Sequence, residues 1–408
     1  MSVKYRLIIM NFLQYAIWGA WLISLGAYLG GGLQFSGRQI GSFFATMGIA
    51  SLFMPAIMGI IADRWIPAQK LLGICHIIGA VLLITAAPQT EYISLYSLIL
   101  CSVMFYMPTI SLSNSVAYNA LEKSGLDAVK SFPPIRVWGT VGFICAMIAI
   151  DLLGFAHSSM QLYSSAILGL ILGAYSFTLP GCPTNKIEKN QSWVDTMGLR
   201  AFALFKQRKM AIFFIFSMLL GVSLQITNAF ANDYLTNFFG NNELYKGTFG
   251  VEHANILISL SQISETLCIL LIPFFLKKFG IKNVMLISMF AWVLRFALLG
   301  TGNPGEGIWM LVLSMLVYGV AFDFFNISGS LYVNQETDPC IRSSAQGVFM
   351  IMTNGFGSFF GSYAAGEIVD RKGWPDSWFI FAGYALVVGI LFAFIFRYNH
   401  NSKEIVNK

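Results

Sequence analysis

The sequence predicts an all-α integral membrane protein. Of its 408 residues, 56% are hydrophobic and only 11% are charged, and the mean hydropathy is +0.68. Soluble domains usually carry about 25% charged residues. Twelve windows of roughly 20 apolar residues, each long enough to cross a bilayer, follow one another along the chain. They fall at about 6–29, 40–62, 70–88, 92–120, 134–155, 160–182, 210–236, 254–276, 283–301, 307–334, 344–366 and 377–397.

One long polar segment divides these windows into two groups of six. It reads "PTNKIEKNQSWVDTMGLRAFALFKQRK" and covers residues 183–209. We therefore predict an N-terminal six-helix bundle in residues 1–182, a cytoplasmic linker loop in 183–209, and a C-terminal six-helix bundle in 210–408 that ends in a short tail. Many secondary transporters have this organisation, with the substrate site between the two bundles near the membrane midplane.

The distribution of basic residues predicts the orientation of the chain. Lys and Arg collect in cytoplasmic loops. With the N-terminus inside, most of the 25 basic residues lie on the inner side, and only Arg38, Lys246, Arg371 and Lys372 fall outside. Both termini are therefore expected in the cytoplasm.

Four charged residues lie inside predicted spans: Arg136, Glu265, Arg295 and Asp323. A charge at the bilayer centre costs about 2.5–3.5 kcal/mol on insertion scales, so each one requires a partner, a water-filled cavity or a function. Such residues are the first candidates for a binding or coupling site.

Asp323 is the most informative of the four. It lies in the middle of the tenth span, within "YGVAFDFFNISGS". On a helical wheel it shares one polar and aromatic arc with Tyr318, Phe322 and Asn326. It is too far from either end of the span for its carboxylate to reach the membrane surface easily. We expect Asp323 to face a cavity, and a buried pair with an arginine is the alternative.

The fifth span supplies a second polar stripe, in "FPPIRVWGTVGF". Pro133 and Pro134 suit the first turn of a helix, where their missing N–H groups would be unbonded anyway. Arg136, Thr140 and Phe143 follow on one helix face. A guanidinium, a hydroxyl and an aromatic ring make a suitable wall for a polar, ring-containing ligand. Alternatively, Arg136 extends to the inner membrane surface.

The seventh span carries amides at helical spacing, in "GVSLQITNAFAND". Gln225, Asn228 and Asn232 can both donate and accept hydrogen bonds, which suits a nucleobase edge or the hydroxyl groups of a sugar. The alternative is that these amides bond to neighbouring helices without contacting a ligand.

The eighth span places Gln262 and Glu265 one turn apart, in "SLSQISETLCILL". A carboxylate buried in such a span can bind and release a proton, so Glu265 joins Asp323 as a candidate for proton coupling. The alternative is a structural ion pair between Glu265 and Arg295 of the ninth span.

Other polar residues are weaker candidates for the same cavity, because such side chains also serve in packing. These are Gln14, Trp18, Asn114, Tyr118, Thr353 and Asn354. His76 and His253 lie towards span ends, and we expect them to be interfacial rather than part of a proton relay.

Several function classes are not expected. The six cysteines and four histidines are scattered, so we predict no metal site, no catalytic residue and no enzymatic activity. The chain has no ATP-binding P-loop pattern. A sensor or scaffold would need a sizeable soluble domain, and the net charge of +6 is explained by membrane topology rather than by nucleic-acid binding.

Long strings in the sequence resemble the nucleoside:proton symporters of the major facilitator superfamily. They include "FPPIRVWGTVGF", "LQITN", "SQISETL", "GIKNVM", "LRFAL" and "YGVAFDFFNISGS", and "GIIADRW" resembles the loop motif of the superfamily in part. The resemblance covers over nine-tenths of the chain. It implies the major facilitator fold and uptake of purine and pyrimidine nucleosides, such as uridine and adenosine, across the bacterial inner membrane.

The resemblance also implies site residues and a coupling ion. The matched cavity positions are Arg136, Thr140, Phe143, Gln225, Asn228, Gln262, Glu265, Tyr318, Phe322 and Asp323, and Asn326 is added from the helical wheel. We expect Asp323 or Glu265 to carry the proton, with no other cofactor, and a protein that transports by alternating access as a monomer. A proton-coupled sugar or oligosaccharide permease is the alternative, because amides, carboxylates and rings suit sugars equally well.

Overall fold

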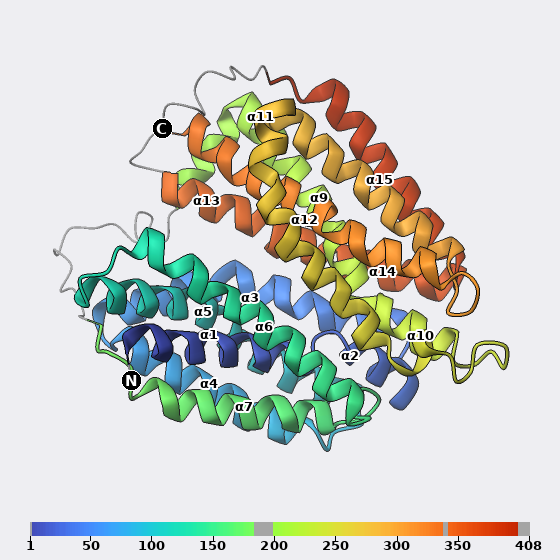
Figure 1. Ribbon diagram of the computed structural model, residues 1–408, viewed down its shortest axis with the longest axis horizontal. Coiled ribbons are helices and arrows are strands. Elements are labelled where there is room, and N and C mark those ends of the chain that lie inside the picture. The colour runs from blue at the N-terminus through green and yellow to red at the C-terminus, as the bar shows by residue number, and fades with distance from the viewer. Residues whose placement is uncertain (1, 183–198, 338–341, 399–408) are drawn as a thin grey trace. The chain divides into compact units, whose positions relative to one another are not determined.

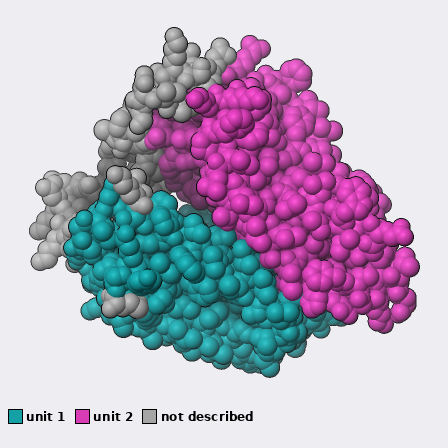
Figure 2. All heavy atoms as spheres, in the orientation of Figure 1, with its two compact units in different colours: residues 1–197 teal, residues 198–408 magenta. Residues whose placement is uncertain are grey.

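The computed structural model describes residues 2–182, 199–337 and 342–398. These residues are predominantly helical and contain no β-strand (Figure 1). The chain forms two compact units, residues 1–197 and residues 198–408 (Figure 2). Most of the predicted linker, residues 183–198, lies outside the described residues.

The described residues of unit 1 form six long helices and two short helical segments. The segments α2 and η1 follow α1, and η1 is a π-helix. The elements are α1 (Val3–Gly19), α2 (Leu25–Ala27), η1 (Tyr28–Gly32), α3 (Gly37–Arg64), α4 (Ala68–Ala86), α5 (Tyr92–Lys123), α6 (Ala128–Leu152) and α7 (Met160–Ser176).

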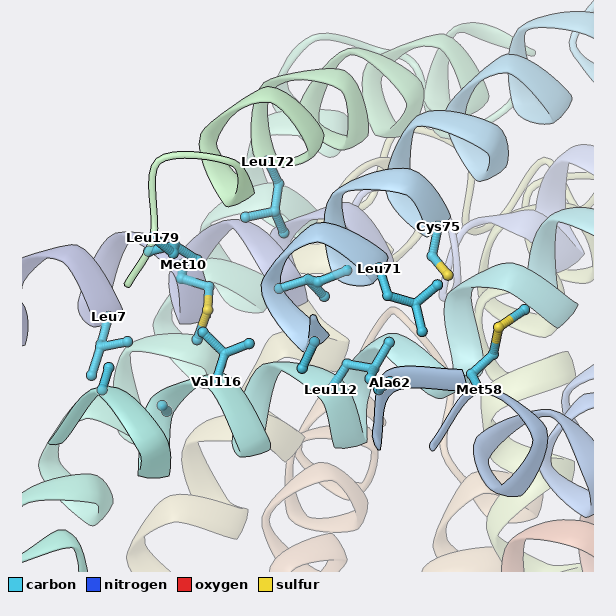
Figure 3. Close-up of a cluster of buried hydrophobic side chains, with 14 of the residues drawn as sticks. Leu7, Met10, Met58, Ala62, Leu71, Cys75, Leu112, Val116, Leu172 and Leu179 are labelled. Atoms are coloured by element: carbon cyan, nitrogen blue, oxygen red, sulfur yellow. The ribbon is translucent and has the colours of Figure 1, made fainter. Parts of the chain in front are cut away.

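The core of unit 1 is formed by side chains from α1, α3, α4, α5, α6 and α7. Leu7 and Met10 of α1 meet Leu71 of α4 and Val116 of α5 there, and all four are buried (Figure 3). The principal helix contacts are α1 with α6, α3 with α5, and α4 with both α5 and α7. Burial of each such side chain contributes roughly 1.5–3 kcal/mol where water is the reference.

Two glycines determine how closely α1 and α6 approach. A Cβ atom at Gly142 would lie 2.1 Å from the Phe12 carbonyl oxygen, and one at Gly19 would lie 2.4 Å from the Phe143 carbonyl oxygen. Small residues allow this backbone-to-backbone packing in membrane helices. The close crossing places α1 directly against the helix that carries Arg136.

The predicted start of the fifth span was wrong. α6 begins at Ala128, so Pro133 and Pro134 lie in its second turn rather than its first. The helix is initiated upstream, where the Ser131 N–H donates to the Asp127 carbonyl. The missing proline N–H groups then leave carbonyl groups unpaired only near the helix end. Arg136 is consequently about two turns inside α6.

Unit 2 combines long helices with π-helical and 3₁₀ segments. The elements are η2 (Leu199–Lys206), α9 (Arg208–Asp233), η3 (Tyr234–Phe238), α10 (Phe249–Glu252), α11 (Ala254–Thr301), α12 (Ile308–Glu336), α13 (Arg342–Met350), η5 (Ile351–Gly357), α14 (Ser358–Lys372) and α15 (Asp376–Ile395). α11 packs chiefly on α12 and α15, and α9 packs on η5 and α14.

α11 is two helices joined at a kink. Gly280 has φ 75° and ψ 166°, a backbone conformation that residues with a side chain rarely adopt. The kink falls where the sequence separates the eighth and ninth predicted spans.

Part of the predicted linker is ordered. Residues 199–206, expected in a loop, form the 3₁₀ helix η2, which packs against α9 and α13. The ring centroids of Phe205 and Phe214 lie 5.2 Å apart. This apolar contact is the physical reason that the end of the linker is held on unit 2.

Eight helices of the described residues are long and apolar enough to cross a membrane. They are Gly37–Ala62, Ala68–Ala86, Tyr92–Lys123, Ser131–Leu152, Arg208–Phe238, Ala254–Thr301, Ile308–Glu336 and Asp376–Ile395, and Met160–Ser176 is a shorter apolar helix. The chain is therefore a multi-pass membrane protein. The count of twelve spans stays a prediction.

Candidate functional site

In unit 1, the three predicted site residues lie on α6. Arg136 and Thr140 are half-buried, and Phe143 is buried. The Cζ atom of Arg136 lies 3.9 Å from the centroid of the Tyr15 ring on α1, a cation–π contact. A Cβ at Gly139 would lie 2.6 Å from this ring and 2.8 Å from Arg136 Nη1, so the glycine leaves room for both groups. The guanidinium is thus held against a ring inside unit 1.

A hydrogen-bond network fixes α1 next to Tyr15. The Gln14 amide nitrogen donates to Thr109 Oγ1 at 2.7 Å, and the Tyr106 hydroxyl donates to the Gln14 carbonyl at 2.8 Å. The Gln14 side-chain oxygen lies 2.8 Å from His76 Nε2. An amide oxygen can only accept, so His76 donates from Nε2. α1 is therefore tied to α4 and α5 one residue before the ring that supports Arg136.

The expectation that His76 is interfacial was wrong. Its side chain is 3% exposed and lies in the middle of α4. A polar partner on α1 makes this burial possible, because Gln14 accepts the ring N–H that would otherwise be left unbonded. No local sequence pattern indicates the pairing, because the two residues are 62 positions apart.

In unit 2, the segment that contains Asp323 lies on α12. Tyr318 and Asp323 are 5% and 3% exposed, and Phe322 and Asn326 are half-buried. The Tyr318 and Phe322 rings stack with centroids 5.8 Å apart and 9° between their planes. Asp323 Oδ2 is buried and has no hydrogen-bond partner among the described residues. A buried carboxyl oxygen without a partner is costly, which marks it as a place for a proton or a ligand.

Arg295 of α11 supports the stacked rings. Its side chain is 2% exposed, and its Cζ atom lies 4.7 Å from the centroid of the Tyr318 ring. Nη1 donates to the Ser314 carbonyl of α12 at 2.7 Å and, more weakly, to Ser261 Oγ at 3.4 Å. The groups that contact this buried cation are therefore a backbone carbonyl, an aromatic ring and, more weakly, the Ser261 hydroxyl and the Met315 sulfur. They leave the guanidinium no access to a ligand.

The second coupling candidate, Glu265, lies on α11 beside this cluster. A Cβ atom at Gly319 would lie 2.5 Å from the Ser264 carbonyl oxygen, so α11 and α12 cross closely at this point. The crossing brings the Glu265 and Asp323 carboxyl groups near enough to interact electrostatically. Two neighbouring carboxyl groups repel one another when both are ionised, so a proton on one of them relieves the repulsion.

The amides of α9 have two different environments. Asn232 donates to Asn255 Oδ1 of α11 at 2.6 Å, so the alternative of interhelical bonding holds for this residue. Gln225 is buried, and its Oε1 has no hydrogen-bond partner in the part of the chain that the structure describes. Asn228, like Gln262 of α11, is half-buried. Gln225 is therefore the amide of α9 whose buried acceptor lacks a donor among the residues described.

A small cavity in unit 2 is lined by two predicted site residues, Phe322 and Asn326. It is also lined by Trp292, Thr353 and Asn354, and its volume is ≈ 20 Å³, room for about one water molecule. Thr353 and Asn354 belong to η5, a π-helix, and such segments are frequent at functional sites.

Two residues of the site were missed by sequence reasoning. Tyr15 holds Arg136, and Trp292 lies edge-on to the Tyr318 ring, with centroids 6.0 Å apart. Neither residue can be recognised from the sequence, because an aromatic residue at a site and one that packs in a core look the same within an apolar span.

The chain shares its length and fold with a known group of transporters. Residues 1–401 match the family model described as nucleoside H+ symporter. The chain belongs to the nucleoside H+ symporter family. Nucleoside permease NupG of Escherichia coli (strain K12) is 50% identical over 407 residues, covering 98% of this chain and 97% of that protein. Xanthosine permease of the same strain is 49% identical over 415 residues, covering 100% and 99%.

A solved structure supports the same assignment. A crystal structure of nucleoside transporter NupG matches with a TM-score of 0.92 and 50% identity, covering 98% of this chain and 100% of that one. Membership of the nucleoside H+ symporter family makes the proton the coupling ion.

Proposed function

We propose that this protein takes purine and pyrimidine nucleosides, such as uridine and adenosine, across the bacterial inner membrane together with protons. Membership of the nucleoside H+ symporter family and 50% identity to a nucleoside permease support this function. Its relatives are transporters, so we propose no enzymatic activity and no cofactor besides the proton.

The proposed architecture is two six-helix bundles of the major facilitator type, with twelve spans in all. Residues 1–182 and 210–408 form the bundles, and residues 183–209 link them on the cytoplasmic side with both termini. The kink at Gly280, which splits α11, supports the higher span count. The distribution of Lys and Arg supports the orientation. We propose that one chain is sufficient for transport.

In the proposed mechanism, alternating access begins when Asp323 or Glu265 takes a proton. The nucleoside base stacks on Phe143, Tyr318 or Phe322. Hydrogen bonds to the base and ribose come from two groups of polar side chains: Arg136 and Thr140 in unit 1, and Gln225, Asn228, Gln262 and Asn326 in unit 2. Stacking needs a ring face, and an amide offers both a donor and an acceptor.

The proton acts by neutralising a carboxylate before the protein closes around it. Enclosing a neutral carboxyl group costs far less than enclosing an ionised one. The membrane potential supplies about 2.3 kcal/mol per proton per 100 mV, and the pH difference adds to it. The observation that carries this proposal is the buried Asp323 Oδ2, without a hydrogen-bond partner among the described residues, beside two stacked rings.

Uptake by purified protein in proteoliposomes tests the function. We expect labelled uridine to accumulate only when a proton gradient is imposed, and Asp323→Asn to abolish accumulation, because an amide cannot take up and release the proton. Glu265→Gln tests the second carboxyl group in the same way. Accumulation of uridine against its gradient by Asp323→Asn would show that Asp323 is not the obligatory coupling group.

Competition separates the proposed function from the sugar alternative. Unlabelled adenosine should inhibit uridine uptake, whereas maltose and sucrose should not. Inhibition by a disaccharide at similar concentration would favour a sugar permease, because the amides and carboxyl groups of the site suit both substrates.

A further inference from the structure

A polar groove on α5 of unit 1 contains none of the site residues that the family resemblance implies, although two of its residues, Asn114 and Tyr118, are weaker candidates from the sequence. Its volume is ≈ 440 Å³, within the range of small-molecule sites. It is lined by Ser111, Asn114, Ser115, Tyr118, Asn119 and Glu122. Their spacing along the chain places them on one helix face. A polar face of this length is unfavourable against lipid, so it needs another partner.

The polar atoms of the groove are not used for helix packing. The Oδ1 atoms of Asn114 and Asn119 are buried, and they have no hydrogen-bond partner within residues 2–182, 199–337 and 342–398. If these amides joined helices together, both oxygens would be bonded. The two acceptors lie about one and a half turns apart on α5 and have no donor among those residues, so a ligand that brings donors could satisfy them after a small side-chain rotation.

Tyr118 adds an aromatic face between the two amides. Its side chain is 42% exposed, and its ring centroid lies 4.6 Å from that of Phe132 on α6. Phe132 thus supports the ring from one side and leaves part of it uncovered. Arg136 follows Phe132 by one turn of α6, but it does not line the groove. The groove therefore adjoins the predicted site of unit 1 without including it.

The chemistry of the lining selects a ligand class. An exposed ring binds a flat base, and amide and hydroxyl oxygens accept hydrogen bonds from ribose hydroxyl groups and base N–H groups. Glu122 is the charged residue among the described residues of the lining. A phosphate group would be repelled, so the groove fits an uncharged nucleoside rather than a nucleotide.

We infer that the α5 groove is a second, transient nucleoside-binding site, which holds the substrate near the cytoplasmic end of α5 during release. Glu122 is the residue before the last residue of α5, and the proposed orientation puts this end of the helix on the cytoplasmic side. The inference rests on the proposed function, since it takes the same substrate class. It adds a release site that discriminates against phosphorylated products.

The test measures affinity separately from the two membrane faces. Right-side-out and inside-out membrane vesicles report the half-saturation concentration for labelled uridine at each face. Removal of a stacking ring weakens base binding about fivefold to a hundredfold. We expect Tyr118→Ala to raise the half-saturation concentration at the inner face by at least about fivefold, with less than a twofold change at the outer face. Tyr118→Phe keeps the ring and should behave like the wild type.

Two further variants complete the design. Asn114→Ala combined with Asn119→Ala removes both acceptors and should have the same sided effect, even where Tyr118→Ala folds poorly. Tyr5→Ala removes a tyrosine that is 64% exposed on α1 and lies outside the groove, so it is the matched control. Uridine monophosphate should fail to compete with uridine at the inner face.

The outcomes are distinguishable from failure of the proposed function. If the wild type does not transport uridine, the proposed function fails. If the wild type transports uridine, three results would overturn the groove site: unchanged inner-face affinity in both the tyrosine and the double asparagine variants, equal changes at the two faces, or Tyr118→Phe matching Tyr118→Ala.

Discussion

Each unit pairs an arginine with a tyrosine ring, but the two pairs differ in burial. In unit 1, Arg136 lies 3.9 Å from the centroid of the Tyr15 ring and is half-buried. In unit 2, Arg295 lies 4.7 Å from that of Tyr318, is 2% exposed and donates to the Ser314 carbonyl.

The difference separates two roles for one chemical contact. A guanidinium whose donors are partly exposed can bind a ligand. One that is buried against backbone and ring can only hold other groups in place. We therefore expect Arg136 to act through substrate affinity and Arg295 through stability and through the position of Tyr318.

The largest expected effect is that of Arg295→Ala. It leaves a cavity beside the Tyr318 ring and the Ser314 carbonyl without its donor, and should cost about 3 kcal/mol of folding free energy, as for large side chains removed from a core. Thermal unfolding in detergent measures the loss. Arg295→Lys keeps the charge but not the planar guanidinium, so its unfolding temperature should lie between those of the wild type and Arg295→Ala. Unfolding at the wild-type temperature by Arg295→Ala would contradict a supporting role.

The close crossing of α11 and α12 beside Tyr318 should give the second largest loss of stability. Gly319→Ala places a Cβ atom 2.5 Å from the Ser264 carbonyl oxygen. It should cost about 1–3 kcal/mol, because α11 and α12 must move apart. Gly383→Ala of α15 is the matched control, since its Cβ atom would have nothing within 4 Å. Equal unfolding temperatures for the two variants would show that the crossing tolerates a methyl group.

Arg136→Ala should change stability by less than about 1 kcal/mol, the range of a partly exposed cation–π contact. Uridine affinity should fall by about tenfold or more, because a charge-assisted hydrogen bond to the ligand is worth about 1.5–3 kcal/mol. Binding of uridine to purified protein measures the affinity, and thermal unfolding measures the stability. The expected difference between the two arginines would be contradicted if Arg136→Ala lost as much stability as Arg295→Ala and kept its uridine affinity.

The smallest effect concerns an exposed charge outside the helices that cross the membrane. Glu91 caps α5, and hydrogen bonds from the Ser94 side chain and from the Ser94 and Ile93 N–H groups lower the pKa of its carboxyl group. The stabilisation is present above the unfolded pKa of about 4.3 and is lost as the pH falls through the lower folded value.

Glu91→Gln should therefore lower the unfolding temperature slightly at pH 7, and the difference from the wild type should shrink as the medium becomes more acidic than pH 4. Glu306→Gln controls for loss of one exposed acidic charge. A difference that persists unchanged at the lowest pH would assign the effect to something other than the cap.

Much of the fold could be predicted because hydropathy is a local property of the chain. Windows of about 20 apolar residues located the long helices, and the gap between the eighth and ninth windows contains Gly280. The start of α6 was harder to predict, because a proline pair is compatible with several positions near a helix end. Residues 199–206 form η2 rather than loop, owing to the contact between Phe205 and Phe214.

The sequence by itself determined which polar side chains lie within apolar helices and which share a helix face. The shared helix face of Asp323, Tyr318 and Phe322 follows from the helical period of 3.6 residues. The choice of Asp323 as a candidate follows from the cost of a charge in lipid. Only the tertiary structure decided what those side chains meet: Tyr15 for Arg136, Ser314 and Tyr318 for Arg295, and Gln14 for His76. The reason is physical. The position of a residue on its own helix depends on neighbours three and four residues away. Its partner depends on how helices distant in sequence approach one another, and glycines such as Gly142 and Gly319 set that approach.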